Sequence, residues 1–195
     1  MGKELPKDKF RRGFKAQAER HSIEYRERVG VKGYQFLSSF VLAEHLGIKV
    51  IAPDNLNGFS PDEFDILTNT RKEEWSAAAI QSFNGSLIII HNKSHSSGRQ
   101  ESNIMHELAH VICGHQMSGI ENRPDIPFTL RTYNQEQENE ADWLGSCLQL
   151  PRPGLTWAYR RGMSEEEIAE HFCSSKDMVR FRTNMTGVKK QFSSR

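Results

Sequence analysis

The chain has 195 residues, a length that suits one domain or one domain with a small appendage. Hydrophobic residues make up 36% of it, and no stretch approaches about 18 uncharged apolar residues, which excludes a membrane-spanning helix. The basic N-terminus lacks the apolar segment of a secretory signal, and the three cysteines are far apart in the sequence. A reducing, cytoplasmic setting is therefore expected.

The formal net charge of +1 hides an uneven distribution of charge. Seven Lys and Arg lie in residues 1–20 and six in residues 176–195, whereas eight Asp and Glu gather in residues 101–142. Basic ends thus flank an acidic middle, and the chain as a whole is not an obvious nucleic-acid binder.

The first half of the chain predicts helices followed by a small sheet. Asn84-Gly85 is a strong hairpin signal between two of the strands, and Ser60 with the acidic residues after it predicts the start of a short helix. The predicted elements are helices over residues 10–29 and 34–46, and strands over residues 48–52, 75–83 and 86–91.

The second half is predicted to be mainly helical. Residues 116–134 contain one glycine and two prolines and predict a loop, and Pro151-Arg152-Pro153-Gly154 predicts the stop of a helix. The predicted helices cover residues 99–115, 135–150, 164–172 and a stretch that begins near Ser175, before a polar, basic tail.

A metal-binding pattern lies inside the helix over residues 99–115. It reads HELAH, and because His106 and His110 are four residues apart, a helix places both imidazoles on one face, where they can bind one metal ion. Glu107 can reach a metal-activated water without binding the metal. Zinc is the metal expected for two nitrogens, a carboxylate and an open position. Apart from Glu107, the residues next to the histidines are uncharged. A chance occurrence of the pattern on a solvent-exposed helix is therefore a poor explanation.

The third ligand must come from elsewhere in the chain. The long pattern HExxHxxGxxH is excluded, because the sequence has Cys113 and Gln116 where that pattern needs Gly and His. The acidic run at residues 136–142 is the better source. Glu138 and Asp142 are four residues apart on one helical face, so Glu138 is expected as the ligand and Asp142 as the partner of a ligand histidine. Glu140 points away from Glu138 by about 200° and is expected to be solvated.

Several linked segments resemble the ImmA/IrrE family of metallo-endopeptidases. The segments are LAEHLGIKV at residues 42–50, the run from SLIIIHN through Arg99 to IMHELAH, and ENEADWLGSCLQLP at residues 138–151. The resemblance spans about residues 34–155. It implies an α+β fold: a compact zincin-like domain with a small antiparallel or mixed sheet packed on the HExxH helix and a glutamate-bearing helix, with helical extensions at both ends.

The resemblance also implies a function. His106, His110 and Glu138 would be the zinc ligands, and Glu107 the general base that takes a proton from the zinc-activated water. Asp142 stands where the family often has Asn. Members of the family typically cut a helix-turn-helix repressor encoded nearby, in stress responses or mobile elements, so a regulatory protein of this type is the expected substrate.

The sequence leaves the substrate contacts open. His115, Arg131 and Tyr133 are candidates for stabilising the oxyanion or contacting the substrate, and nothing in the sequence chooses among them. The strand over residues 86–91 could offer an edge to an extended substrate.

The C-terminal piece has two interpretations. Residues 164–185 resemble, loosely, a helix-turn-helix with an apolar core, and its basic side chains could meet phosphates; the favoured alternative packs these helices on the peptidase. The expected core residues are Ile168, Phe172, Met178, Val179 and Phe181, and the basic residues are Lys176, Arg180, Arg182, Lys189 and Lys190.

The sequence therefore predicts an N-terminal helical extension (residues 1–33), a zinc peptidase core (34–155) and a C-terminal helical segment (156–195). The favoured function is a zinc endopeptidase. The competing one is a DNA- or protein-binding regulatory module with a structural or vestigial zinc site.

Overall fold

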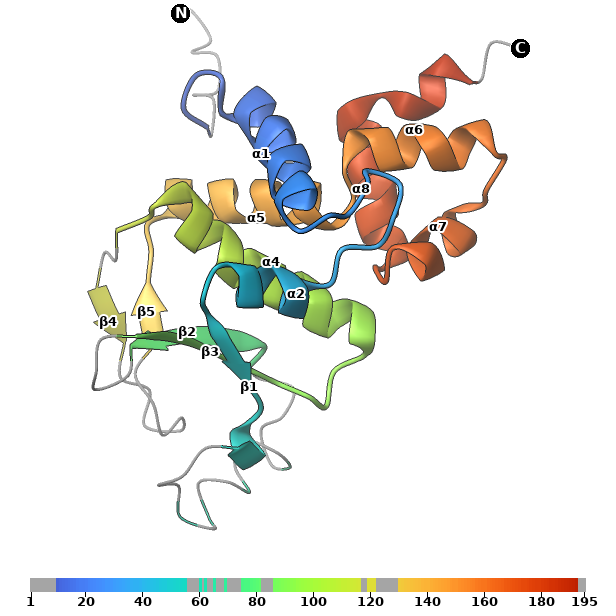
Figure 1. Ribbon diagram of the computed structural model, residues 1–195. Helices are drawn as coiled ribbons and strands as arrows, with labels where there is room; N and C mark the ends of the chain where they lie inside the picture. Colours follow the sequence, from blue (N-terminus) through green and yellow to red (C-terminus); the bar gives the residue numbers. More distant parts are fainter. Residues whose placement is uncertain are drawn as a thin grey trace, which may run out of the picture.

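The computed structural model describes residues 10–55, 75–81, 86–116, 119–121 and 130–192, together with residues 60, 62, 65 and 69. The predicted α+β class is confirmed, with helices packed over a small sheet (Figure 1). None of the described helices is long and apolar enough to cross a membrane. The described α-helices are α1 (Phe14–Arg28), α2 (Ser39–His45), α4 (Ser97–Cys113), α5 (Gln135–Gln149), α6 (Arg152–Arg160), α7 (Glu165–His171) and α8 (Lys176–Thr186). The strands are β1 (Lys49–Ile51), β2 (Ala77–Gln81), β3 (Leu87–His91), β4 (Gly119–Glu121) and β5 (Leu130–Thr132).

Two of the predicted helices begin later than expected. Helix α1 begins at Phe14, because Gly13 just before it has a left-handed conformation with φ of 81°. Helix α2 begins at Ser39, because the side chain of Ser38 caps it by accepting a hydrogen bond from the Phe40 amide. The helix expected after Ser60 lies almost wholly outside the described residues, and the Asn84-Gly85 turn lies outside them altogether.

The main sheet has the strand order β1-β3-β2, with β1 parallel and β2 antiparallel to β3. The central strand is therefore β3, and both of its edges are taken. The expectation that the strand over residues 86–91 offers an edge to a substrate is thus wrong, because pairing with β1 and β2 uses its backbone groups. Strand β2 lies at one end of this sheet, and its outer edge, away from β3, faces α4.

Helices α4 and α5 pack against each other at the centre of the main core. Leu108 on α4 and Leu144 on α5 are fully buried there. A Cβ added to Gly145 of α5 would lie 3.3 Å from both the His106 nitrogen and the Met105 carbonyl oxygen of α4. The absence of a side chain at Gly145 thus lets α5 approach the backbone of α4 directly beside the first histidine of the HExxH pattern.

Residues 116–134 are not only loop. Strands β4 and β5 pair antiparallel within this segment, with Ile120 opposite Arg131. The sequence did not predict these strands for two reasons. The glycine and prolines of the segment are typical of a loop, and three residues are too few to show an alternating pattern.

The C-terminal helices form a second apolar cluster that includes Ile168, Phe172 and Val179. Helix α6 was not predicted: it begins directly after Pro151, because proline suits the start of a helix as well as the end of one. Phe181, expected in the core, is 41% exposed and forms a T-shaped ring contact with Trp143. Arg182, expected to meet phosphates, is fully buried.

Two buried arginines bind the C-terminal end of α5. Arg26 of α1 donates to the carbonyl oxygens of Leu148 (2.8 Å) and Gln149 (3.3 Å), and burial lowers its pKa to about 10. Arg182 of α8 donates to the carbonyl of Leu150 at 3.0 Å and pairs with Glu19 at 2.7 Å. The last carbonyls of a helix carry partial negative charge, so both guanidinium groups complement the helix dipole and hold the terminal helices to α5.

Replacing Arg26 with leucine is expected to lower the free energy of unfolding by about 2–4 kcal/mol, because it leaves buried carbonyl groups without donors. Urea unfolding followed by circular dichroism measures the change. Arg20→Leu, an exposed position on the same helix, is the matched control and should change the stability little. Equal effects of the two substitutions would show that the bonds to the α5 carbonyls contribute nothing.

Candidate metal centre

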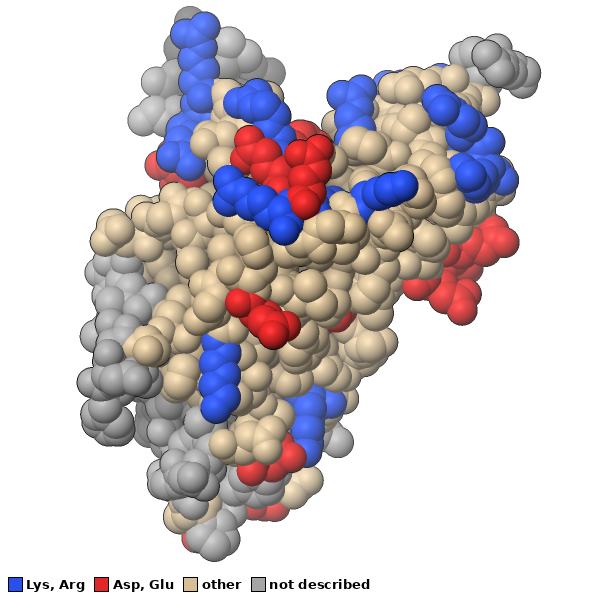
Figure 2. Space-filling view, in the orientation of Figure 1, with Lys and Arg blue, Asp and Glu red and all other residues tan. Residues whose placement is uncertain are grey.

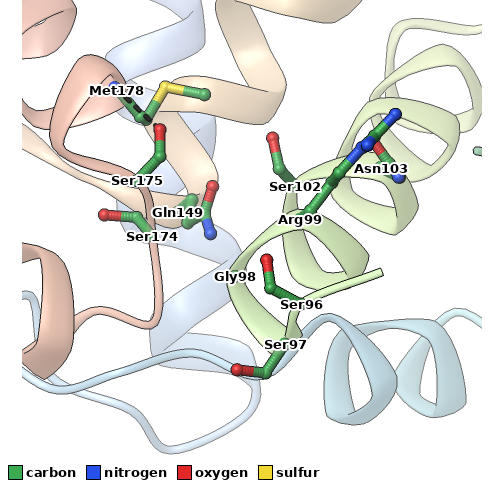
Figure 3. Close-up of a pocket in the computed structure, with 10 residues that line it drawn as sticks. All are labelled: Ser96, Ser97, Gly98, Arg99, Ser102, Asn103, Gln149, Ser174, Ser175 and Met178. Carbon is green, nitrogen blue, oxygen red and sulfur yellow. Dashed lines mark hydrogen bonds between the residues drawn. The ribbon is translucent and has the colours of Figure 1, made fainter. Parts of the chain in front are cut away.

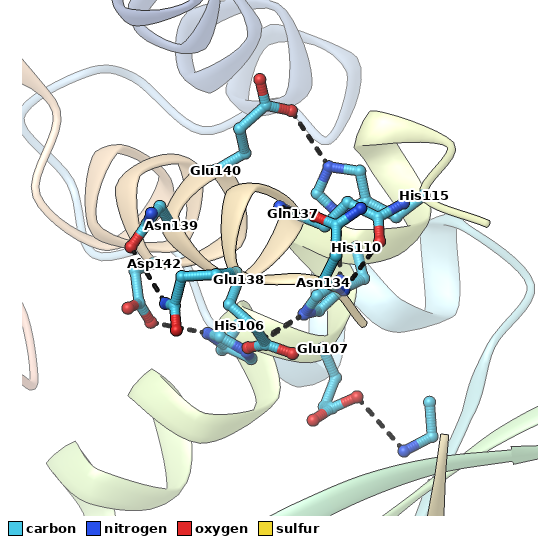
Figure 4. Close-up of polar contacts among 12 residues, drawn as sticks. His106, Glu107, His110, His115, Asn134, Gln137, Glu138, Asn139, Glu140 and Asp142 are labelled. Carbon is cyan, nitrogen blue, oxygen red and sulfur yellow. Dashed lines mark hydrogen bonds and ion pairs between the residues drawn. The ribbon is translucent and has the colours of Figure 1, made fainter. Parts of the chain in front are cut away.

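Helix α4 presents His106 and His110 on one face, as the spacing predicts. Their Nε2 atoms are 3.1 Å apart (Figure 4). The side chain of His110 is only 2% exposed, whereas that of His106 is 27% exposed. The pair therefore sits at the boundary between the core and solvent, with one imidazole open to an incoming ligand.

Glu138 reaches the same point from the first turn of α5. Asn134 and Gln137 form a capping box that fixes the start of this helix at Gln135, three residues before Glu138. A carboxylate oxygen of Glu138 lies 3.2 Å from His106 Nε2 and 3.7 Å from His110 Nε2. The three side chains thus bring two nitrogens and one oxygen within 4.8 Å of one another.

The spacing of these donor atoms fits a metal ion. A tetrahedral zinc with bonds of about 2.0–2.1 Å places neighbouring ligand atoms about 3.3–3.4 Å apart. The separations of 3.1, 3.2 and 3.7 Å bracket that value. Two imidazoles and one carboxylate are also the donor set of a catalytic zinc site, which keeps a fourth position open.

Asp142 lies one helical turn beyond Glu138 and contacts His106 from the other side. Its carboxylate is 2.9 Å from His106 Nδ1, and its side chain is 74% exposed. In the neutral ring that binds a metal, a carboxylate at Nδ1 holds the proton there, so that the lone pair is on Nε2, the atom that faces Glu138 and His110.

The charges of the cluster favour one bound cation. Burial lowers the pKa of His106, but hydrogen bonds to Asp142 and Glu138 outweigh burial and raise that pKa to about 10. Burial, and then the charge of His106, lowers the pKa of His110 to about 3. The hydrogen bond from His106 lowers the pKa of Glu138. Without metal, the cluster therefore holds a proton on His106, which a metal ion must displace.

Glu107 lies between the cluster and the sheet. Its carboxylate accepts a hydrogen bond of 3.2 Å from the Ala79 amide of β2 (Figure 4). Strand β2 pairs with β3 through alternate residues, since the Ser76 carbonyl accepts from the Asn92 amide. The backbone groups of Ala77 and Ala79 consequently point to the other edge of β2, towards Glu107.

The three residues named as substrate contacts lie in different places. Tyr133 stacks on the His110 ring, with centroids 3.7 Å apart and planes 18° from parallel. His115 lies behind His110, with its Nδ1 2.9 Å from His110 Nδ1, and its side chain is 5% exposed. The backbone of Arg131 belongs to β5, and its side chain lies outside the described residues.

Glu140 was expected to be solvated, and this is wrong. Its side chain is 5% exposed and contacts His115 Nε2 at 3.1 Å and Arg11 Nε at 3.0 Å. The helical angle correctly turned Glu140 away from Glu138, but α1 and the end of α4 cover that side of α5. The sequence signal that could have found this contact is the histidine at position 115, five residues after His110 and just past the end of α4.

A separate cavity of about 520 Å³ lies at the opposite end of α4 (Figure 3). Its lining comes from the first turns of α4 and α8 with Gln149 between them, and includes Ser96, Arg99 and Ser175. None of its lining residues is a histidine, cysteine or carboxylate. This cavity is therefore not a second metal site of the kind formed by His106, His110 and Glu138.

The pKa of His106 predicts how the stability of the metal-free protein depends on pH. Its folded pKa of about 10 lies above the ordinary 6.5, so its stabilising effect is complete below pH 6.5 and is lost as the pH rises to about 10. In excess chelator, the stability difference between wild type and His106→Gln should shrink over this range, as measured by urea unfolding. Exposed His45→Gln is the control, and a pH-independent difference for His106→Gln would contradict the proton assignment.

Comparison with known proteins gives one family. The sequence model of a peptidase family described as the IrrE N-terminal-like domain matches residues 43–184. No curated protein matches the chain. A solved structure of a Mycobacterium tuberculosis transcriptional regulator matches with a TM-score of 0.45 and 12% identity, and the match covers 87% of this chain and 46% of that one. The chain thus spans about half the length of that regulator.

The family match takes in well over half of the chain, and α4 and α5 with the His106, His110 and Glu138 cluster lie within it. The family and the cluster together indicate a metal-binding, peptidase-type domain. The chain belongs to the peptidase family of IrrE N-terminal-like domains.

Proposed function

We propose that the protein is a zinc-dependent endopeptidase that cuts a regulatory protein. The observation that carries the proposal is the convergence of two imidazoles, one carboxylate and a separate glutamate beside a strand edge. A metal site with a purely structural role has no use for Glu107, which is placed beside the ligands without being one of them. All of these groups lie within residues 34–155, the segment proposed as the peptidase core.

His106, His110 and Glu138 are proposed to hold the zinc, and Asp142 to orient His106. A zinc ion held there supplies Lewis acidity, which polarises a peptide carbonyl and makes water a stronger acid. Glu107 takes the proton from the attacking water and later gives it to the leaving amine nitrogen. Its hydrogen bond to the Ala79 amide keeps the carboxylate aimed at the space between α4 and β2.

The substrate is proposed to bind in an extended conformation along β2. In the described residues no strand is hydrogen-bonded to the edge of β2 that faces away from β3. An extended peptide can pair with the outward backbone groups of this edge other than the Ala79 amide, which Glu107 binds, and this brings a peptide bond beside Glu107. Main-chain pairing of this kind requires a target segment that is locally unfolded or flexible. The class of target protein that the family resemblance suggests is a helix-turn-helix repressor.

A DNA-binding role for the C-terminal helices has less support. Lys176 pairs with Glu166 at 2.9 Å, and Arg180 pairs with Glu165 at 2.8 Å. Acidic side chains gather over α7 in the space-filling view (Figure 2). Since the α7 glutamates neutralise these cations and Arg182 is buried, α8 presents no clear phosphate-binding face.

Cleavage tests the proposed function directly. The purified protein is incubated with a repressor-type protein encoded next to it, with and without chelator, and the products are followed by mass spectrometry. We expect metal-dependent cleavage that falls by at least about 100-fold in Glu107→Gln, because the general base is removed.

The control is Glu136→Gln, the same change at an exposed position of α5, which should cleave as wild type does. Metal content is measured for each variant and should stay unchanged in Glu107→Gln. Cleavage that survives chelation, or that Glu107→Gln performs at the wild-type rate, would contradict the proposal.

A further inference from the structure

The second histidine of the HExxH pattern has a polar chain of contacts behind it. His110 uses Nε2 towards His106 and Glu138, and its Nδ1 lies 2.9 Å from Nδ1 of His115. His115 Nε2 then contacts a carboxylate oxygen of Glu140 at 3.1 Å (Figure 4). The other oxygen of Glu140 pairs with Arg11 at 3.0 Å. The chain therefore runs from the proposed metal ligand to the segment that precedes α1.

We propose that His115 and Glu140 are positioning residues that fix the ring orientation and tautomer of His110 for metal binding. The proposal rests on the proposed function, since it takes His110 as a metal ligand. It gives His115 a role in holding a ligand rather than in contacting the substrate.

The chemistry of the two imidazoles sets the direction of every hydrogen bond. If Nε2 of His110 offers its lone pair to a metal, the neutral ring carries its proton on Nδ1 and must donate to His115. His115 accepts at Nδ1, so its own proton sits on Nε2 and is donated to Glu140. Each donor then meets an acceptor. Because the Glu140 carboxylate can only accept, it fixes the direction of both hydrogen bonds.

Burial makes this chain specific. The side chains of His110, His115 and Glu140 are 2%, 5% and 5% exposed, so water cannot readily replace any of the partners. A buried carboxylate is costly unless it is paired, and Glu140 is paired with both His115 and Arg11. The Tyr133 ring covers one face of His110, which restricts tilting of the imidazole.

The two proposed histidine ligands thus have different supports. His106 contacts Asp142 directly, but the side chain of Asp142 is 74% exposed, so water competes with His106 for its carboxylate. His110 reaches its carboxylate through a second imidazole, in a place that excludes water. The buried chain is therefore expected to contribute more to metal affinity than Asp142 does.

Cys113, His115 and Glu140 also bring donor atoms within 4.8 Å of one another, which raises the alternative of a second metal site. Both ring nitrogens of His115 are already engaged, one by His110 and one by Glu140. A metal at this place would have to break one of these contacts and compete with Arg11. The geometry favours the hydrogen-bonded chain.

Zinc affinity measured by chelator competition tests the assignment in the full chain. We expect His115→Leu to bind zinc 10–100-fold more weakly than wild type, the range typical for loss of an outer partner of a metal ligand. His115→Asn should recover part of the loss, because its amide oxygen can accept from His110 Nδ1. Cys113→Ser is the control from the same cluster and should bind as wild type does.

Substitution of cobalt for zinc gives a visible absorption spectrum that a general loss of protein stability would not shift. The visible absorption of bound Co²⁺ should shift in His115→Leu and Glu140→Gln, because the ligand field of His110 changes, and should be unchanged in Cys113→Ser. If His115→Leu does not fold, as judged by circular dichroism, His115→Asn and Glu140→Gln carry the comparison.

The outcomes separate the two proposals. Failure of the wild-type protein to bind zinc at near one equivalent would overturn the proposed function itself. One tightly bound zinc with wild-type affinity and spectrum in all His115 and Glu140 variants would overturn the positioning role alone. Two equivalents, with the second lost in Cys113→Ser, would replace the hydrogen-bonded chain with a second metal site.

Discussion

The close packing of α5 on α4 is the constraint on which the proposed metal centre depends. One helix supplies two imidazoles and the other supplies the carboxylate, so the donor atoms converge only if the helix backbones approach closely. Gly145 permits this approach, since a Cβ there would lie 3.3 Å from the backbone nitrogen of His106. The buried guanidinium groups of Arg26 and Arg182 then hold the far end of α5 in place. The geometry of the site is thus set by contacts on both sides of it.

The acidic middle of the sequence acquires a physical meaning in the fold. Glu138 and Asp142 face His106 from one side of α5, whereas Glu140 faces the opposite side and meets His115 and Arg11. One short stretch of helix thus supplies a carboxylate directly to His106 and, through His115, another to His110. Lys176 and Arg180 of α8 are matched instead by glutamates of α7, and Arg182 of α8 by Glu19 of α1.

The sequence predicted the parts of the site that follow from helical periodicity. A spacing of four residues placed His106 beside His110 and Glu138 in line with Asp142 without reference to tertiary structure. The prediction for Glu140 failed because it considered only the face of α5 towards the metal, and burial of the opposite face depends on α1. The contact of Glu107 with the Ala79 amide and the central place of β3 depend on strand order, which short strands do not encode locally.

The most direct test of the central claim is the X-ray absorption spectrum of the zinc-loaded protein at the zinc edge, which reports the atoms bound to the metal. We expect one zinc with two imidazole nitrogens and carboxylate oxygen at about 2.0–2.2 Å, and one imidazole fewer in His110→Ala. A sulfur ligand at about 2.3 Å would place the metal at Cys113 instead, and a shell of oxygen atoms alone would mean that His106 and His110 do not bind it.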